Sequence, residues 1–222
     1  MTLELEQHET QKARWPRTGR HILAQFDADS VVVYQAYRPE VGRWAVDHQQ
    51  FGGPWSFNRM SWVKPNFLWM MYRSGWGTKP DQEVTLAVRL RRPAFDAILA
   101  AAVHSSFAPH AYPTEAAWTA AVADSEVRLQ WDPDHSPAGG PLERRAIQLG
   151  LRGDVLRRYA TEWVVSIEDV CNMVAEQREN RSSPERLLTP RERVYPVADP
   201  DVRRRLGIDT FIERQEEPAV TP

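Results

Sequence analysis

Residues 59–76 place aromatic rings and cations in one uninterrupted block, Arg59-Met-Ser-Trp-Val-Lys-Pro-Asn-Phe-Leu-Trp-Met-Met-Tyr-Arg-Ser-Gly-Trp76. A cleft with aromatic walls and a few convergent polar groups is typical of a nucleotide site. A buried corner of core aromatics is the alternative explanation of the same block. The polar heads that a purely structural corner would not need are those of Arg59, Ser61, Lys64, Tyr72 and Arg73. The block therefore predicts a pocket for a planar, anionic ligand.

Further polar side chains stand at the ends of predicted strands that are far apart in the sequence. In chain order these strand-end residues are Gln35, Arg38, Ser61, Trp62, Lys64 and Glu162. Functional side chains are commonly gathered where a rigid scaffold ends in loops. We therefore expect these residues to converge on one crevice.

The elements that must position them alternate between strands and helices. Period-2 patterns and β-branched runs predict strands at 31–37, 59–64, 83–90, 126–131, 145–150 and 162–168. Helical spacing and proline starts predict helices at 40–50, 65–73, 94–103, 113–123, 154–160 and 169–180. Residues 132–141 are rich in Pro, Gly and Asp and predict an irregular loop. The pattern indicates an α+β fold with a mixed, strongly twisted sheet of about six strands and flanking helices.

The 222 residues leave room for one domain with a sizeable core. Residues 1–20 are polar and lack sustained periodicity, so we expect a mobile N-terminal arm. Residues 21–180 form the predicted single domain. Residues 181–222 form a C-terminal extension rich in Pro, Arg and Glu, and we expect its end, from about Gln215, to be disordered.

Composition narrows the function classes. A net charge of −2 provides no overall basic field for nucleic acid or membranes, and the single cysteine, Cys171, excludes an intrachain disulfide framework. His104, His110 and His135 have no carboxylate at ligand spacing, so no metal site is expected. The chain carries no G-x-S-x-G, Walker, G-x-G-x-x-G or H-E-x-x-H motif. It also lacks an apolar run long enough to span a bilayer, which predicts a cytoplasmic protein without a membrane partner.

The chain resembles a widespread, poorly characterised bacterial and fungal domain family marked by W-x-K-P-x-F-L-W-M-M-Y-R-x-G-W and E-W-x-V-x-I-E-D. These motifs stand at 62–76 and 162–169, and the resemblance covers residues of about 20 to 180. Three segments, in matching chain order, also resemble ADP-ribosyltransferases of the poly(ADP-ribose) polymerase type. The middle one, the aromatic block, lies where that family has a strand bearing Tyr or Ser, followed by a helix. Residues 33–38 are similar to that family's first nucleotide-binding strand, with Gln35 where the family has His. Residues 161–166 are similar to its Asn-Glu-Tyr-Ile-Val-Tyr strand, which carries the catalytic glutamate.

This second resemblance implies an ADP-ribosyltransferase-like fold and activity: a glycosyltransferase with NAD as substrate and no metal. ADP-ribose would pass to a macromolecular acceptor, either nucleic acid (RNA or DNA) or protein. Cleavage of the nicotinamide–ribose bond builds positive charge on the sugar, and a carboxylate beside it stabilises the transition state. The resemblance assigns that carboxylate to Glu162. Gln148, polar inside an apolar strand, is its rival for this position.

The remaining expected site residues bind the dinucleotide. Trp62, with Tyr72, is expected to stack on the nicotinamide ring, and Gln35 to bond the ribose hydroxyls. Arg38 and Lys64 are expected at the pyrophosphate. Tyr34 and Ser61 complete the expected NAD-binding set.

Two other functions fit the same residues. A non-catalytic nucleotide-binding or nucleic-acid-binding module would use Trp62, Trp69 and Trp76 with nearby arginines as a stacking groove. An RNA-processing enzyme that removes a 2′-phosphate on the same fold would need further basic residues in the pocket, such as Arg145 beside Lys64.

Overall fold

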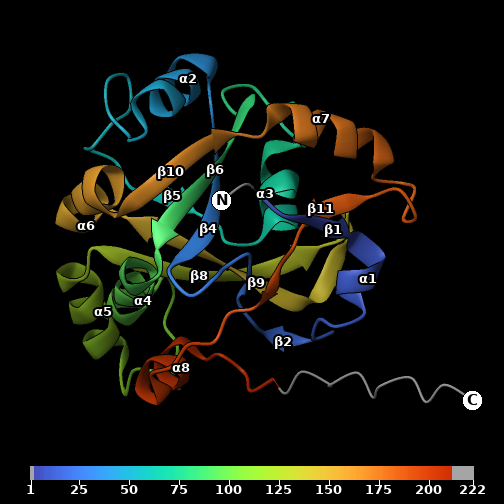
Figure 1. The fold of residues 1–222 in the computed structure, drawn as a ribbon. Coiled ribbons are helices and arrows are strands. Elements are labelled where there is room, and N and C mark those ends of the chain that lie inside the picture. The colour runs from blue at the N-terminus through green and yellow to red at the C-terminus, as the bar shows by residue number, and fades with distance from the viewer. Residues whose placement is uncertain (1–2, 212–222) are drawn as a thin grey trace, which may run out of the picture.

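Two curved β-sheets, joined at one point, form the centre of the protein in a computed structural model that describes residues 3–211 (Figure 1). The smaller sheet is antiparallel in the order β10-β6-β4. The larger sheet runs β2-β9-β8-β7, with β5 paired to β9, and its β2–β9 and β7–β8 pairs are parallel. The two joined sheets together form a curled, mixed β-structure that helices flank, which confirms the predicted α+β class.

The strands of these sheets are β2 (Gly19–Arg20), β4 (Ser30–Tyr37), β5 (Ser61–Val63), β6 (Val84–Arg91), β7 (Ala102–His104), β8 (Val127–His135), β9 (Pro141–Leu151) and β10 (Val164–Asp169). The helices are α1 (His8–Lys12), α2 (Pro39–His48), α3 (Phe67–Ser74), α4 (Arg92–Ala101), α5 (Glu115–Asp124), α6 (Gly153–Arg158), η1 (Tyr159–Trp163), α7 (Cys171–Asn180) and α8 (Pro200–Leu206). Helix α2 packs on β6 and β10, α4 on β4 and β6, and α3 between β4 and β8.

Strand β4 is buried on both faces, as its continuous apolar start predicts. Val31 and Val33 belong to the main core, which also contains strands of the larger sheet. Val32 and Tyr34 point the other way and pack with α3 and α7 in a second cluster. The strand thus separates two cores and holds the polar residues at its end in a fixed place.

The two sheets meet where Tyr34 of β4 pairs with Lys64, just after β5. The amide of Tyr34 donates to the carbonyl of Lys64 at 2.7 Å, and the amide of Lys64 donates to the carbonyl of Tyr34 at 3.2 Å. Past this bridge β4 continues along β6, whereas β5 pairs with β9. Residues 35–37 and 59–62 therefore lie on the two sides of the place where the sheets part.

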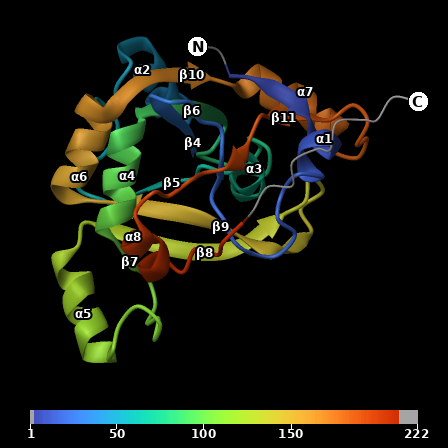
Figure 2. The ribbon, with the colours of Figure 1, turned by 60° about the horizontal axis from the view of Figure 1, so that its bottom comes forward.

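Both ends of the described chain belong to the fold, which corrects the predicted boundaries at 20 and 180. Strand β1 (Leu5–Gln7) pairs with β11 (Leu188–Pro190), and β3 (Leu23–Ala24) pairs with β12 (Arg193–Val194). Figure 2 shows β1 beside β11, with α1 next to them. Trp15 is buried and its indole N–H donates to the carbonyl of Glu192 at 3.0 Å. The expected disordered end, from about Gln215, lies outside the described residues.

Three element boundaries also differ from the sequence pattern. Strand β8 continues through Pro133 to His135, so the loop predicted for 132–141 is wrong in its first residues. Helix α3 starts at Phe67 rather than Pro65, because the Asn66 side chain accepts from the amide of Trp69 and caps the helix. Strand β10 begins only at Val164, since the π-helix η1 occupies the residues before it. Among residues 3–211, no helix is both long and apolar enough to cross a bilayer.

Candidate functional site

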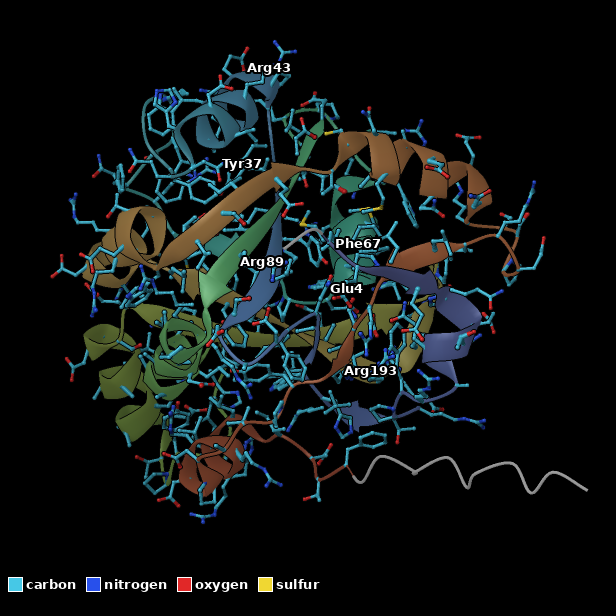
Figure 3. The ribbon with its side chains drawn as sticks, viewed as in Figure 1. Glu4, Tyr37, Arg43, Phe67, Arg89 and Arg193 are labelled. Atoms are coloured by element: carbon cyan, nitrogen blue, oxygen red, sulfur yellow. The ribbon has the colours of Figure 1, made fainter. Side chains whose placement is uncertain are left out.

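A two-lobed groove opens where the two sheets part, and we call it the central groove. Its inner lobe of about 480 Å³ is lined by Gln35, Ala36, Tyr37, Arg59, Met60, Ser61, Trp62, Lys64, Met70, Arg73, Pro80, Asp81 and Gln82. Its outer lobe of about 250 Å³ is lined by Tyr37, Arg38, Val41, Pro54, Trp55, Ser56, Arg59, Ser61 and Asp81. Four of these residues, Tyr37, Arg59, Ser61 and Asp81, line both lobes, so the lobes adjoin. Tyr37 and Phe67, labelled in Figure 3, mark the end of β4 and the start of α3.

Three cations of the aromatic block line the inner lobe. Arg59, Lys64 and Arg73 have no ion-pair partner within residues 3–211. Arg59 and Arg73 are exposed, whereas Lys64 is 6% exposed. Three positive groups around one cavity favour an anionic ligand, because they repel one another when the cavity is empty.

The environment of Lys64 lowers its pKa to about 8. Burial is the largest cause, repulsion from Arg73 adds to it, and the charge of Asp132 partly offsets both. A bound anion would favour the charged ammonium and raise this pKa again. Lys64 is thus a group whose protonation is coupled to anion binding.

Gln35 is the centre of a buried hydrogen-bond network at the base of the groove. Its amide nitrogen donates to the hydroxyls of Tyr37 at 2.7 Å and Ser61 at 2.9 Å, and lies 3.2 Å from the carbonyl oxygen of Trp62. Its amide oxygen accepts from the hydroxyl of Tyr159 at 2.5 Å. Because both the nitrogen and the oxygen of the amide are hydrogen-bonded, Gln35 has a structural role at the base of the groove and has no free group for a ribose hydroxyl.

Trp62 forms part of the wall of the inner lobe and lies over Gly150 of β9. A Cβ atom on Gly150 would sit 2.5 Å from the Met60 sulfur and 3.0 Å from the Trp62 ring. Glycine at this position therefore allows both side chains to lie close to the sheet. The prediction that Gln35, Ser61, Trp62 and Lys64 converge on one cavity agrees with the structure.

Gln148 lines neither lobe of the groove. Its amide nitrogen donates to Oδ2 of Asp132 at 2.7 Å, and Gln130 donates to Oδ1 of the same carboxylate at 2.8 Å. The two glutamines therefore hold in place the carboxylate that acts on the pKa of Lys64. The partner that a half-buried Gln148 requires is Asp132.

Glu162 is not in the groove, which corrects the central expectation from the sequence. It lies in the π-helix η1, its side chain is 60% exposed, and it pairs with Arg158 at 3.2 Å. It lines neither lobe. The three predicted strand tips do not all converge, because the π-helix replaces the expected start of the last strand.

Two further expected site residues, Tyr34 and Tyr72, lie outside the groove, and Arg38 lies in its outer lobe. Tyr34 is fully buried with its ring edge-to-face against Phe67, so it is a core residue. Tyr72 is 43% exposed and stacks on His135 at 3.5 Å, away from the groove. Arg38 lines the outer lobe rather than the inner one, and its side chain lies 3.6 Å from Glu40.

The residues proposed for the alternative functions are not brought together either. Trp69 and Trp76 are buried and do not line the groove beside Trp62, so the three indoles form no stacking platform. Arg145 is exposed on β9 and lines neither lobe, so it is not a partner of Lys64.

Sequence reasoning missed several residues of the groove. Arg59 and Arg73 are not among them, since the sequence already names both as polar heads of the aromatic block. Asp81, which has a left-handed backbone with φ of 62° and lines both lobes, carries no sequence signal. Trp55 and Tyr159 are recognised only through their bonds to Tyr37 and Gln35.

Comparisons with known proteins give one family. The model of the family described as "Domain of unknown function (DUF4291)" matches residues 21–195. A search of curated proteins finds no match to this chain.

Proposed function

We propose, from the premise that this chain belongs to the DUF4291 family, that the central groove binds NAD and that the protein transfers ADP-ribose from it to a macromolecular acceptor. The observation that carries the proposal is that cations without an ion-pair partner in residues 3–211 line two adjoining lobes of one groove. NAD consists of two ring systems joined by a diphosphate, so a groove of this form suits it. The ADP-ribosyltransferase resemblance of residues 33–38 supports the same ligand.

The lobes provide one position for each part of the dinucleotide. Arg59 is common to both lobes and is positioned for the diphosphate, where a guanidinium gives two parallel donors. Lys64 and Arg73 add positive charge in the inner lobe. Trp62 lines the inner lobe and Trp55 the outer one, so each ring system has an indole nearby. Base–aromatic stacking typically contributes about 1–3 kcal/mol per ring.

Asp81 supplies the carboxylate that the transfer step requires. Among the residues lining the two lobes it is the acidic one, and it lies where the lobes join. As the nicotinamide leaves, the ribose becomes cationic, and a carboxylate beside it stabilises that state more than the ground state. In this proposal Asp81 takes the role that the ADP-ribosyltransferase resemblance assigns to Glu162.

Binding is tested first, by isothermal titration calorimetry of the full chain with NAD, ADP-ribose and nicotinamide. We expect NAD and ADP-ribose to bind, with affinities at least about tenfold lower in Lys64→Met and Arg59→Ala. Arg43→Ala is the matched control, since Arg43 is exposed on α2 (Figure 3) and lines neither lobe. Absence of NAD binding, or equal losses in the control, would refute the proposal.

Transfer is tested by incubation with labelled NAD and total cellular RNA, DNA and protein. Label should become attached to one class of acceptor, and Asp81→Asn should abolish that labelling while NAD still binds. A non-catalytic nucleotide-binding module is the second candidate, favoured by the saturated amide of Gln35. It predicts NAD binding, no labelling and no effect of Asp81→Asn.

A further inference from the structure

Lysine is rare in this chain, and one lysine lines the inner lobe of the central groove. Lys12, Lys64 and Lys79 are the three lysines among the 28 lysine and arginine residues of the sequence. A guanidinium keeps its proton in proteins, whereas an ammonium can release one and become a nucleophile. In a lobe that Arg59 and Arg73 already line, Lys64 therefore adds a chemistry that a third arginine could not.

The backbone of Lys64 is held where the two sheets meet. Its amide and its carbonyl are both bonded to Tyr34, at 3.2 Å and 2.7 Å. Side chains alternate along an extended segment, so Lys64 faces the same way as Trp62, while Val63 between them packs in the main core. Trp62 and Lys64 accordingly both line the inner lobe. The lysine side chain thus enters the cavity from a rigid part of the fold.

The amino group of Lys64 has no partner, yet a ligand can reach it. Its Nζ makes no hydrogen bond or ion pair within residues 3–211. Several partnerless polar atoms of the described chain are sealed from solvent, but Nζ of Lys64 is not one of them, so it keeps accessible surface in the lobe. The other two lysines are engaged, since Lys12 pairs with Glu9 at 3.1 Å and Lys79 donates to the carbonyl of Arg73 at 2.8 Å.

The surroundings of Lys64 favour its neutral amine. Trp62 and Met70 contribute apolar walls to the lobe, and the lysine is only 6% exposed. This burial and the nearby charge of Arg73 lower its pKa to about 8, against a partial opposing effect of Asp132. At pH 8 about half of these amines are neutral, compared with well under about 1% for a lysine with the ordinary pKa of 10.5. Desolvation next to another cation is a general means of making a lysine nucleophilic.

We propose that Lys64 forms an imine with the carbonyl group of an anionic small molecule, whose charge Arg59 and Arg73 bind. The lone pair of Nζ attacks the carbonyl carbon, a C–N bond forms, and one proton passes from nitrogen to oxygen. The carbinolamine then loses this oxygen as water together with the second proton of the nitrogen, which leaves a C=N bond. Nothing is oxidised or reduced. The inner lobe, at about 480 Å³, has the size of a small-molecule site.

This reaction goes beyond the function proposed for NAD and does not depend on it. A bound anion that favours the ammonium of Lys64 favours the protonated imine by the same attraction, so it does not oppose the product. The carbonyl compound and NAD would occupy the same lobe and compete for it. The two proposals nevertheless fail separately, because labelling of Lys64 by an aldehyde requires no NAD and NAD binding requires no imine.

The test uses pyridoxal 5′-phosphate, an aromatic aldehyde with a phosphate group, on the full chain at pH 8. Borohydride reduces any imine to a stable secondary amine, and peptide mapping by mass spectrometry then locates it. We expect Lys64 to be labelled at least about tenfold faster than Lys12 or Lys79, which are internal controls within the parent protein. Pyridoxal, the same aldehyde without the phosphate, should label Lys64 at least about tenfold more slowly.

Two variants locate the anion. Arg59→Ala removes a guanidinium that does not act on the pKa of Lys64, and it should reduce the preference for the phosphorylated aldehyde at least about threefold. Arg43→Ala, at an exposed position on α2 (Figure 3), should keep the preference. Similar labelling rates for the three lysines, similar rates for the two aldehydes at Lys64, or a preference that Arg59→Ala leaves unchanged would each overturn the proposal.

Discussion

The hydroxyl of Tyr159 donates to the amide oxygen of Gln35 at 2.5 Å, across 124 residues of sequence. Both side chains are buried, Tyr159 completely. The bond ties the π-helix η1 to the end of β4 at the base of the central groove. Gln35 also donates to the hydroxyls of Tyr37 and Ser61. Its side chain therefore connects η1, β4 and β5.

Tyr159→Phe should therefore destabilise the protein. It removes the donor and leaves the buried amide oxygen of Gln35 unsatisfied, which costs about 1–3 kcal/mol. Urea denaturation followed by circular dichroism measures the loss. Tyr72→Phe is the matched control, because Tyr72 is 43% exposed and the change should stay within about 0.5 kcal/mol. Equal stabilities of the two variants would contradict the role given to the network.

Lys64→Met should make the stability less dependent on pH in the alkaline range. The folded pKa of Lys64 is about 8 and its ordinary value is 10.5, so between them the unfolded chain holds a proton that the folded chain has released. The stability of the parent protein therefore rises with pH over this window, by about 1.4 kcal/mol for each unit by which the two pKa values differ. Denaturation midpoints between pH 7 and 10.5 should show this rise in the parent protein and a flatter profile in the variant.

The same group makes ligand binding depend on pH. Because a bound diphosphate favours the charged ammonium, NAD affinity should fall as pH rises through about 8. Lys64→Met should bind weakly at all pH values and lose this dependence. Calorimetric titrations at pH 7 and 9 measure both effects, and an NAD affinity that rises with pH in the parent protein would contradict them.

Glu162→Gln should change little. The Glu162–Arg158 pair is more than half exposed on both sides, and pairs of this kind typically contribute under about 0.5 kcal/mol. The residue also lies outside both lobes, so labelling of an acceptor by NAD should be retained. Loss of labelling in this variant, with Asp81→Asn active, would restore Glu162 as the catalytic carboxylate.

Glu192→Gln should remove a pH dependence near neutrality. Burial raises the pKa of Glu192 to about 8, although the amide of Phe67 donates to it at 2.6 Å and partly opposes the shift. The folded chain keeps a proton that the unfolded chain releases above its ordinary pKa of 4.5. The contribution of Glu192 to the stability of the parent protein should therefore be greatest below pH 4.5 and should fall as the pH rises to about 8.

A thermal denaturation series from pH 4.5 to 8.5 measures this contribution. The variant should lose the fall, while Glu185→Gln, an exposed control, should keep it. Identical slopes in the variant and the parent protein would show that Glu192 does not hold its proton in the folded state.

The strands around β4 follow from the sequence because each has a local signature. Three consecutive valines and the run at 83–90 predict a paired, buried centre, and the tyrosine and glutamine that follow predict a polar end. The aromatic block likewise predicts the groove-lining side chains Trp62 and Lys64. These properties belong to short stretches of sequence, so local physical rules recover them.

The rest depends on long-range pairing that no local pattern reveals. Glu162 has the composition of a strand start, but the extra turn of η1 moves it to the surface. Asp81 reaches the groove only because the sheets part beside it. Residues 3–20 look polar and irregular, yet Gln11 and Trp15 are buried against residues 189–192. Such contacts are recognised only when the two segments that make them are seen side by side in the structure.

Strand β1 closes against β11, which follows it by more than 180 residues. On the ribosome the first of these segments is made while its partner is still to be translated. Until residue 192 has emerged, the indole of Trp15 and the amide of Phe67 lack the main-chain carbonyl and the carboxylate that Glu192 later provides. The nascent polypeptide must therefore keep the earlier segment unpaired while the residues between the two strands are added, an interval in which chaperone capture would be most useful.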